Sequence, residues 1–169
     1  MAQGIGDLDT PCVLIDLDRV MANIARAQAH ADAHGLKLRP HVKTHKLPQF
    51  AKLQIEAGAV GITVQKLGEA EVMADAGLTD LFLTYNIVGA QKLARLQALN
   101  QRVTLAVAAD SEATIAGYSA AFADTGKPLR VFIECDTGGG RCGVPTPASY
   151  ALSSTSLASG WTPASSTAR

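Results

Sequence analysis

Short apolar segments alternate along the chain with longer segments in which apolar residues recur at helical spacing. Each apolar segment has the length of a β-strand and is bounded by Gly, Pro or polar residues. After the first of them, Leu17, Val20, Met21 and Ile24 share one helical face, and Gly35 ends that pattern. We therefore predict strands at residues 12–16, 36–42, 60–64, 81–85, 102–108 and 129–135.

A helix is predicted in each interval between these strands. The first expected helix runs from residue 17 to Gly35, and the second ends at residue 57. The third and fourth run from about 66 to 76 and from about 89 to 99. The fifth begins at an Asp110 cap and buries Ile115, Tyr118 and Phe122. Strands joined by one helix each are parallel neighbours. This α/β rhythm fits both a doubly wound sheet and a (β/α)8 barrel, and periodicity does not choose between them.

Composition narrows the class of protein. Apolar residues form 47% and charged residues 18% of the 169 positions, which indicates a globular domain. The formal net charge is zero, which argues against nucleic acid or an anionic membrane surface as a partner. The longest apolar runs are too short to span a membrane, and the N-terminus lacks an export pattern. The odd set Cys12, Cys135 and Cys142 favours free thiols, so we expect a cytoplasmic protein.

The composition changes after "RCGVPTP". Ten of the residues 149–169, "SYALSSTSLASGWTPASSTAR", are Ser or Thr, and they show no strand pattern. We therefore expect residues 1–148 to form the folded part. Residues 149–169 are expected to be a low-complexity tail, either disordered or produced by a frameshift or truncation near residues 148–150.

The stretch "RPHVKTHK" places Lys43 where a predicted strand meets a helix. The C-terminal end of a parallel strand is the usual catalytic edge of an α/β fold. Burial and the nearby cations Arg39 and Lys46 would favour the neutral amine, which Schiff-base chemistry with a carbonyl or pyridoxal phosphate requires. The alternative interpretation is a solvated lysine at a strand end.

The stretch "CDTGGGRCGV" contains a G-x-G-x-x-G pattern at Gly138, Gly140 and Gly143. A dinucleotide site also needs an acidic residue roughly 20 positions further on, and no acidic residue follows Asp136. A dinucleotide site is therefore rejected. A glycine run after a strand still allows close approach of a ligand and presents amide donors to an anion, so Arg141 is predicted to face a ligand.

Two histidine pairs have the four-residue spacing of some metal sites. His30 and His34 lie at the polar end of a predicted helix without a third ligand, which favours a solvated surface. His41 and His45 flank Lys43, and we interpret them as its polar neighbours rather than as a metal pair.

Three stretches resemble the D-threonine aldolase and D-serine dehydratase family, whose N-terminal domain is similar to that of alanine racemase. They are "DTPCVLIDLDRVMANIARAQAHADAHGLKLRPHVKTHK", "GAVGITVQKLGEAEVMADAG" and "ECDTGGGRCGV". The resemblance covers about residues 7–147. It implies the fold of type III pyridoxal-phosphate enzymes: a partial (β/α)8 barrel of the alanine racemase N-terminal type, with about five barrel strands beginning at residues 36–42. Residues 12–16 would instead join a C-terminal β-domain.

The resemblance also implies site residues. Lys43 matches the lysine that binds pyridoxal 5'-phosphate covalently, and Arg141 matches the arginine near the phenolic oxygen of the cofactor. Gln65 and His41 would lie at the same mouth and contact the cofactor. A divalent metal (Mn, Mg or Zn) is implied too, with ligands in a C-terminal part that this sequence does not match.

The activity implied is metal-assisted retro-aldol cleavage of D-β-hydroxy-amino acids, with a small D-amino acid as substrate and a homodimer as the assembly. D-Serine dehydratase activity and a truncated, non-catalytic fragment are the alternatives. A racemase is disfavoured, because alanine racemases place a tyrosine four residues past the lysine and this chain has Leu47 there.

Overall fold

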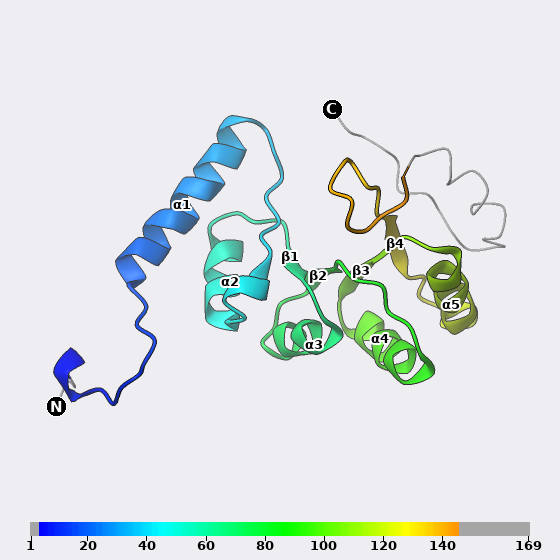
Figure 1. The fold of residues 1–169 in the computed structure, drawn as a ribbon, viewed down its shortest axis with the longest axis horizontal. Coiled ribbons are helices and arrows are strands. Elements are labelled where there is room, and N and C mark those ends of the chain that lie inside the picture. Colours follow the sequence, from blue (N-terminus) through cyan, green and yellow to red (C-terminus); the bar gives the residue numbers. More distant parts are fainter. Residues whose placement is uncertain (1–3, 146–169) are drawn as a thin grey trace.

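A parallel four-stranded sheet forms the centre of the protein in the computed structural model, which describes residues 4–145 (Figure 1). The strands lie in the order in which they occur in the chain, and every neighbouring pair is parallel. They are β1 (Ile62–Val64), β2 (Asp80–Leu83), β3 (Thr104–Ala109) and β4 (Arg130–Ile133). The predicted parallel α/β arrangement is therefore confirmed.

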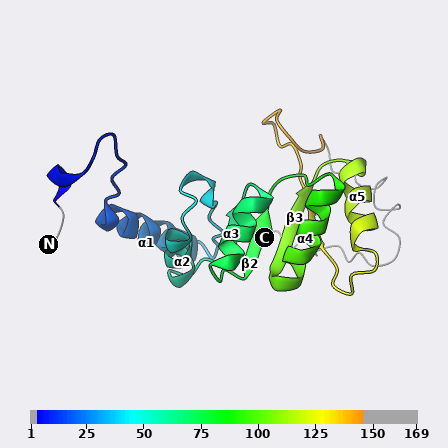
Figure 2. The same cartoon turned by 90° about the horizontal axis from the view of Figure 1, so that it is seen from below.

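The helices that connect successive strands lie along one side of the sheet (Figures 1 and 2). They are α3 (Leu67–Asp75), α4 (Ala90–Arg102) and α5 (Glu112–Phe122). Helices α1 (Leu17–Ala33) and α2 (Pro48–Glu56) precede the sheet, together with the short 3-10 helices η1 (Ile5–Asp7) and η2 (Val42–Thr44). Among residues 4–145, none of the helices combines the length and apolar character needed to cross a bilayer.

The hydrophobic core lies between the sheet and these connecting helices. In β2, Leu81 and Leu83 are fully buried, while Phe82 between them is only partly buried and faces the other side of the sheet. On that other side the Phe82 ring packs against Phe132 of β4, with ring centroids 5.1 Å apart. The apolar residues that alternate in the sequence thus divide between two faces, as expected for strands of a barrel wall.

The predicted strand at residues 36–42 is reduced to a single bridge, in which His41 pairs with Thr63 in parallel. The Thr63 N–H donates to the Pro40 carbonyl at 2.8 Å. Pro40 has no N–H to donate in return, so a longer ladder does not form there. The expected five barrel strands are therefore four strands and one bridged segment.

The predicted strand at residues 12–16 was wrong within the described part of the chain. These residues are not assigned to a strand, and Val13, Leu14 and Ile15 are exposed. Helix α1 follows as predicted, with the Asp16 carboxylate accepting the Arg19 N–H at 3.0 Å as its N-cap. The predicted tail at residues 149–169 lies outside the described residues.

The predicted Asp110 cap of helix α5 was also wrong. The N-cap is Ser111, whose hydroxyl accepts the Thr114 N–H at 3.4 Å. Ile115 and Tyr118 are buried as predicted, and Phe122 packs against the core while remaining partly exposed. The other predicted helices are present, with ends shifted by a few residues.

Candidate functional site

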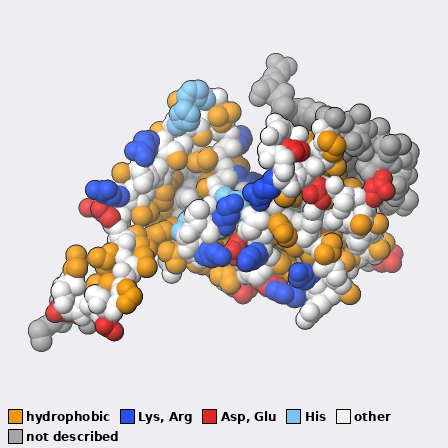
Figure 3. Space-filling model, in the orientation of Figure 1, with side chains coloured by type: hydrophobic (Ala, Val, Ile, Leu, Met, Phe, Trp, Pro, Cys, Tyr) orange, Lys and Arg blue, Asp and Glu red, His pale blue; other side chains and the backbone are white. Residues whose placement is uncertain are grey.

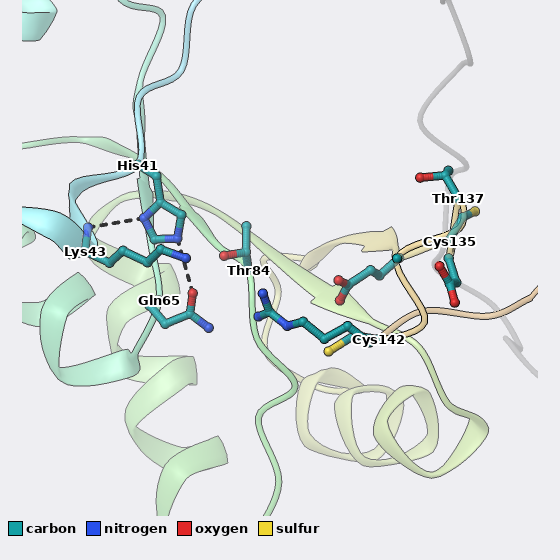
Figure 4. A pocket seen from close by; sticks show the side chains of 11 residues that line it. His41, Lys43, Gln65, Thr84, Cys135, Thr137 and Cys142 are labelled. Atoms are coloured by element: carbon teal, nitrogen blue, oxygen red, sulfur yellow. Dashed lines mark hydrogen bonds between the residues drawn. The ribbon is translucent and has the colours of Figure 1, made fainter.

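One pocket of about 320 Å³ lies at the edge of the sheet where the strands end. Its lining includes all four residues that the sequence singles out: His41, Lys43, Gln65 and Arg141. Parallel strands end at a common edge, so residues far apart in sequence meet there. The remaining lining residues are Thr84, Glu134, Cys135, Asp136, Thr137, Gly139 and Cys142 (Figure 4).

Lys43 is held by the short turn η2. Val42 is completely buried and anchors the turn in the core, and its carbonyl accepts the Lys46 N–H at 2.7 Å. Lys43 itself is exposed at the mouth of the pocket. Figure 4 shows its side chain extending toward Gln65, with Thr84 next along the mouth.

His41 links the Lys43 turn to the end of β1. The Lys43 N–H donates to His41 Nδ1 at 3.2 Å, and His41 Nε2 lies 3.2 Å from Gln65 Oε1 (Figure 4). Because Nδ1 accepts a backbone N–H, the ring proton is on Nε2, which donates to the amide oxygen. Burial lowers the pKa of His41 and the Lys43 charge adds to that effect, outweighing the opposing bond to Gln65. His41 is therefore a neutral imidazole at pH 7.

The electrostatic environment predicted for Lys43 was wrong. Arg39 Nη1 lies 2.8 Å from Asp80 Oδ1, and Lys46 Nζ lies 2.9 Å from Glu69 Oε1. Each neighbouring cation thus pairs with its own carboxylate, and the Lys43 side chain is exposed rather than buried. The Arg39 pair depends on Gly61, because a Cβ there would lie 2.0 Å from Arg39 Nη1.

The glycine-rich loop folds around its own aspartate. The Asp136 carboxylate accepts the Gly138 N–H at 2.9 Å and the Gly140 N–H at 3.1 Å, and these bonds lower the pKa of Asp136. The prediction that these amides are available to a ligand anion was therefore wrong. Arg141 lies in the same loop and lines the pocket, but it is exposed rather than enclosed by glycines.

The loop returns to the end of β4. The Asp136 N–H donates to the Val144 carbonyl at 2.9 Å, and the Val144 N–H donates to the Glu134 carbonyl at 2.9 Å. Asp110, after β3, accepts an Asn86 side-chain N–H and the Gly143 N–H. Asp110 therefore ties three strand-end loops together.

Sequence reasoning did not single out Asp110, Thr84 or Glu134 as part of this edge. The available signal was position, because each follows directly after a predicted or observed strand. A polar residue at the C-terminal end of a parallel strand can be assigned to this edge of the sheet even when it belongs to no motif.

The other three histidines are not among the residues that line the pocket. His30 and His34 are exposed on or beside α1, with ring centroids 4.3 Å apart, in agreement with a solvated surface. The His45 ring packs edge-on against Phe50, its Nδ1 accepts the Leu47 N–H at 3.0 Å, and burial lowers its pKa. Within residues 4–145, no group of three His, Cys, Asp or Glu side chains is arranged to hold a metal ion.

Positive side chains gather in the middle of the face shown in Figure 3, over the region where Figure 1 places the sheet. A neutral imidazole, a primary amine and a guanidinium lining one pocket suit a small anionic ligand that carries a carbonyl group.

Comparisons with known proteins agree with this geometry. Residues 15–158 match the family described as "Alanine racemase, N-terminal domain". The D-threonine aldolase of Arthrobacter sp. is 39% identical over 137 residues, which are 81% of this chain and 36% of that protein. The D-threo-3-hydroxyaspartate dehydratase of Delftia sp. (strain HT23) is 43% identical over 137 residues, with the same shares of the two chains. This chain thus spans a little over one third of these relatives.

A solved structure gives the same result. The D-threonine aldolase from Filomicrobium marinum superposes with a TM-score of 0.83 at 38% identity, covering 88% of this chain and 40% of that one. The match confirms the predicted fold class, a partial barrel of the alanine racemase N-terminal type.

Proposed function

This chain belongs to the alanine racemase N-terminal domain family, and from that premise we propose that it carries the cofactor-binding part of a pyridoxal-phosphate-dependent lyase for D-β-hydroxy-amino acids. One observation carries the proposal. Three segments distant in sequence bring His41 and Lys43, Gln65, and Arg141 to a single pocket at the C-terminal edge of a parallel sheet.

The pocket suits the reactive end of pyridoxal phosphate. The Lys43 amine can bond to its aldehyde carbon, and the Arg141 guanidinium can pair with its phenolic oxygen. A volume of about 320 Å³ is at the small end of ligand pockets, which range over roughly 300–1,000 Å³. The amides of Gly138 and Gly140 bind Asp136, so we assign the cofactor phosphate to donors other than these.

In this proposal the residues of the chain have distinct tasks. Pyridoxal phosphate, when bound, supplies an electron sink for cleavage of a bond at the substrate Cα. Lys43 Nζ would hold the cofactor at its aldehyde carbon, and the same amine could carry a proton near the substrate Cα. Arg141 presents a permanent cation, and His41 and Gln65 hold the backbone from which Lys43 extends.

The proposal includes a divalent metal (Mn, Mg or Zn), which would supply Lewis-acid chemistry at the β-hydroxyl of the substrate. A variant of a D-threo-3-hydroxyaspartate dehydratase has been solved in a metal-free form, which is consistent with metal binding by that relative. Because residues 4–145 contain no group of three suitable side chains, we place the metal ligands in a part of the enzyme outside this range.

A dehydratase is the second candidate activity. The Delftia dehydratase is 43% identical to this chain, compared with 39% for the Arthrobacter aldolase. The two reactions give different products from D-threonine: an aldolase releases glycine and acetaldehyde, whereas a dehydratase releases ammonia and a 2-oxo acid. Product analysis therefore separates them.

Labelling with pyridoxal phosphate and borohydride tests the cofactor assignment. We expect intact mass and peptide mapping to show one dominant adduct at Lys43 that is absent from Lys43→Ala, because Lys43 is the only lysine among residues 4–145 that lines the pocket. Lys52→Ala is the matched control, since Lys52 is an exposed lysine of helix α2. Labelling spread evenly over many lysines would contradict the proposal and favour a chain without cofactor chemistry.

A further inference from the structure

Lys46 follows the Lys43 turn with an unusual backbone conformation. Its φ is +57°, which no other non-glycine residue within 4–145 shares. A left-handed conformation is unfavourable for an L-residue, so neighbouring contacts must maintain it. One is the Lys46 N–H bond to the Val42 carbonyl, which closes the turn around Lys43.

The second contact is the ion pair between Lys46 and Glu69. Lys46 Nζ lies 2.9 Å from Glu69 Oε1, and the side chain of Glu69 is only 10% exposed. Burial alone would raise the pKa of Glu69, but Lys46 and the backbone N–H of Gln65 outweigh burial and lower it. A nearly buried carboxylate of this kind depends on its partners to remain charged.

Glu69 also holds the opposite side of the Lys43 turn. Its Oε2 accepts the Gln65 N–H at 3.0 Å, and the Gln65 side chain accepts a bond from His41 Nε2. His41 Nδ1 in turn accepts the Lys43 N–H. Glu69 is therefore connected to the Lys43 turn on two sides. One connection runs through Gln65 and His41, and the other runs through Lys46.

We propose that Glu69 is a positioning residue for Lys43, because its two oxygens fix both ends of the turn that presents the Lys43 amine to the pocket. The inference rests on the proposed function, in which that amine binds the cofactor. An exposed lysine has many rotamers, so directing its amine requires a backbone that does not move.

The variant Glu69→Gln tests the proposal, because the amide keeps the shape of the side chain and its acceptor oxygen while removing the charge. We expect the share of pyridoxal-phosphate adduct found at Lys43, relative to all lysines, to fall by about fivefold or more. Glu71→Gln is the matched control on the same helix: it removes the ion pair between Glu71 and Arg95 and should leave the Lys43 share unchanged.

A second pair of variants covers the case in which Glu69→Gln does not fold. Lys46→Asn tolerates the left-handed backbone but lacks the ammonium, whereas Lys46→Arg keeps a cation that reaches Glu69. We expect Lys46→Asn to lose the Lys43 preference and Lys46→Arg to retain it. A merely stabilising role would lower the melting temperature of Lys46→Asn without changing which lysine is labelled, and that result would overturn the proposal.

Amide hydrogen exchange of residues 41–47 separates this inference from the proposed function. If the wild-type protein shows no preference for Lys43, the cofactor assignment fails, but faster exchange in Lys46→Asn than in Lys46→Arg still supports the fixed turn. If the wild-type protein labels at Lys43 and folded Glu69→Gln labels equally well, the positioning role of Glu69 is wrong while the cofactor assignment stands.

Discussion

Single glycine positions decide where the loop that carries Arg141 can lie. Gly143 has a φ of +97°, and a Cβ there would lie 2.5 Å from the backbone nitrogen of Asp136. The overlap would be with backbone atoms, which cannot rotate away as a side chain could. A Cβ at Gly139, in the same loop, would lie 3.9 Å from its nearest neighbour, Asp136 Oδ1, which is an ordinary contact. Residues that look alike in "GGGRCG" therefore differ in what they permit.

We expect Gly143→Ala to open the glycine-rich loop and move Arg141 away from the pocket. The backbone overlap and positive φ should cost about 1–3 kcal/mol, which is enough to break the paired bonds between Val144 and the end of β4. Amide exchange of Asp136 and Val144 should become faster by tenfold or more, as ~1.4 kcal/mol per tenfold change implies. Gly139→Ala is the control, and equal exchange in the two variants would contradict this account.

At the scale of elements, the helices follow local rules and the loops between strands and helices do not. Helix α5 begins at the capping hydroxyl of Ser111, whereas the neighbouring carboxylate of Asp110 turns to Asn86 and Gly143. Either residue type is a good N-cap, so the sequence alone leaves the choice open. The choice is made by the adjacent strand ends, which offer Asp110 two donors.

Ser111→Ala should lower the free energy of unfolding by about 1 kcal/mol, because the Thr114 N–H loses its acceptor. Urea denaturation measures the change. Ser119→Ala serves as the control, since Ser119 is an exposed position within α5 where alanine is the better helix former. A variant Ser111→Ala as stable as the wild type would show that the cap contributes nothing measurable.

At the scale of the whole molecule, buried polar groups of the core also bond to the backbone near the pocket edge. The Tyr118 hydroxyl, buried under the edge, accepts the Ile87 N–H at 2.8 Å and donates to the Ala108 carbonyl, and burial raises the pKa of Tyr118 to about 12. Burial also lowers the pKa values of His41 and His45, which flank Lys43 in the sequence. Stability and the site therefore respond together to pH.

We expect the protein to become less stable as the pH falls below about 6.5. Burial lowers the pKa values of His41 and His45 beneath their ordinary value of 6.5, so the unfolded chain binds protons more readily than the folded one. This stability is fully present above pH 6.5 and is lost as the pH falls through the lowered pKa values. Chemical denaturation at several pH values measures the slope.

The variant carrying His41→Gln and His45→Gln should show a flatter dependence below pH 6.5, since the two groups that take up protons on unfolding are gone. The variant carrying His30→Gln and His34→Gln, which changes the exposed histidines near the end of α1, is the matched control and should keep the wild-type slope. The same slope in both variants would exclude the Lys43-flanking histidines as its cause.

The sequence pattern by itself determined the order of the helices and of strands β1 to β4 after residue 16, whereas the resemblance to a known family implied that Lys43, Gln65 and Arg141 share one edge. Periodicity reports which face of an element is buried, and parallel topology brings strand ends together. Only the tertiary structure decided that residues 36–42 form a bridge and that the glycine amides bind Asp136. The tertiary structure alone also decided that Lys46 pairs with Glu69. Such pairings depend on how close two separate segments approach, and a local pattern contains no measure of that distance.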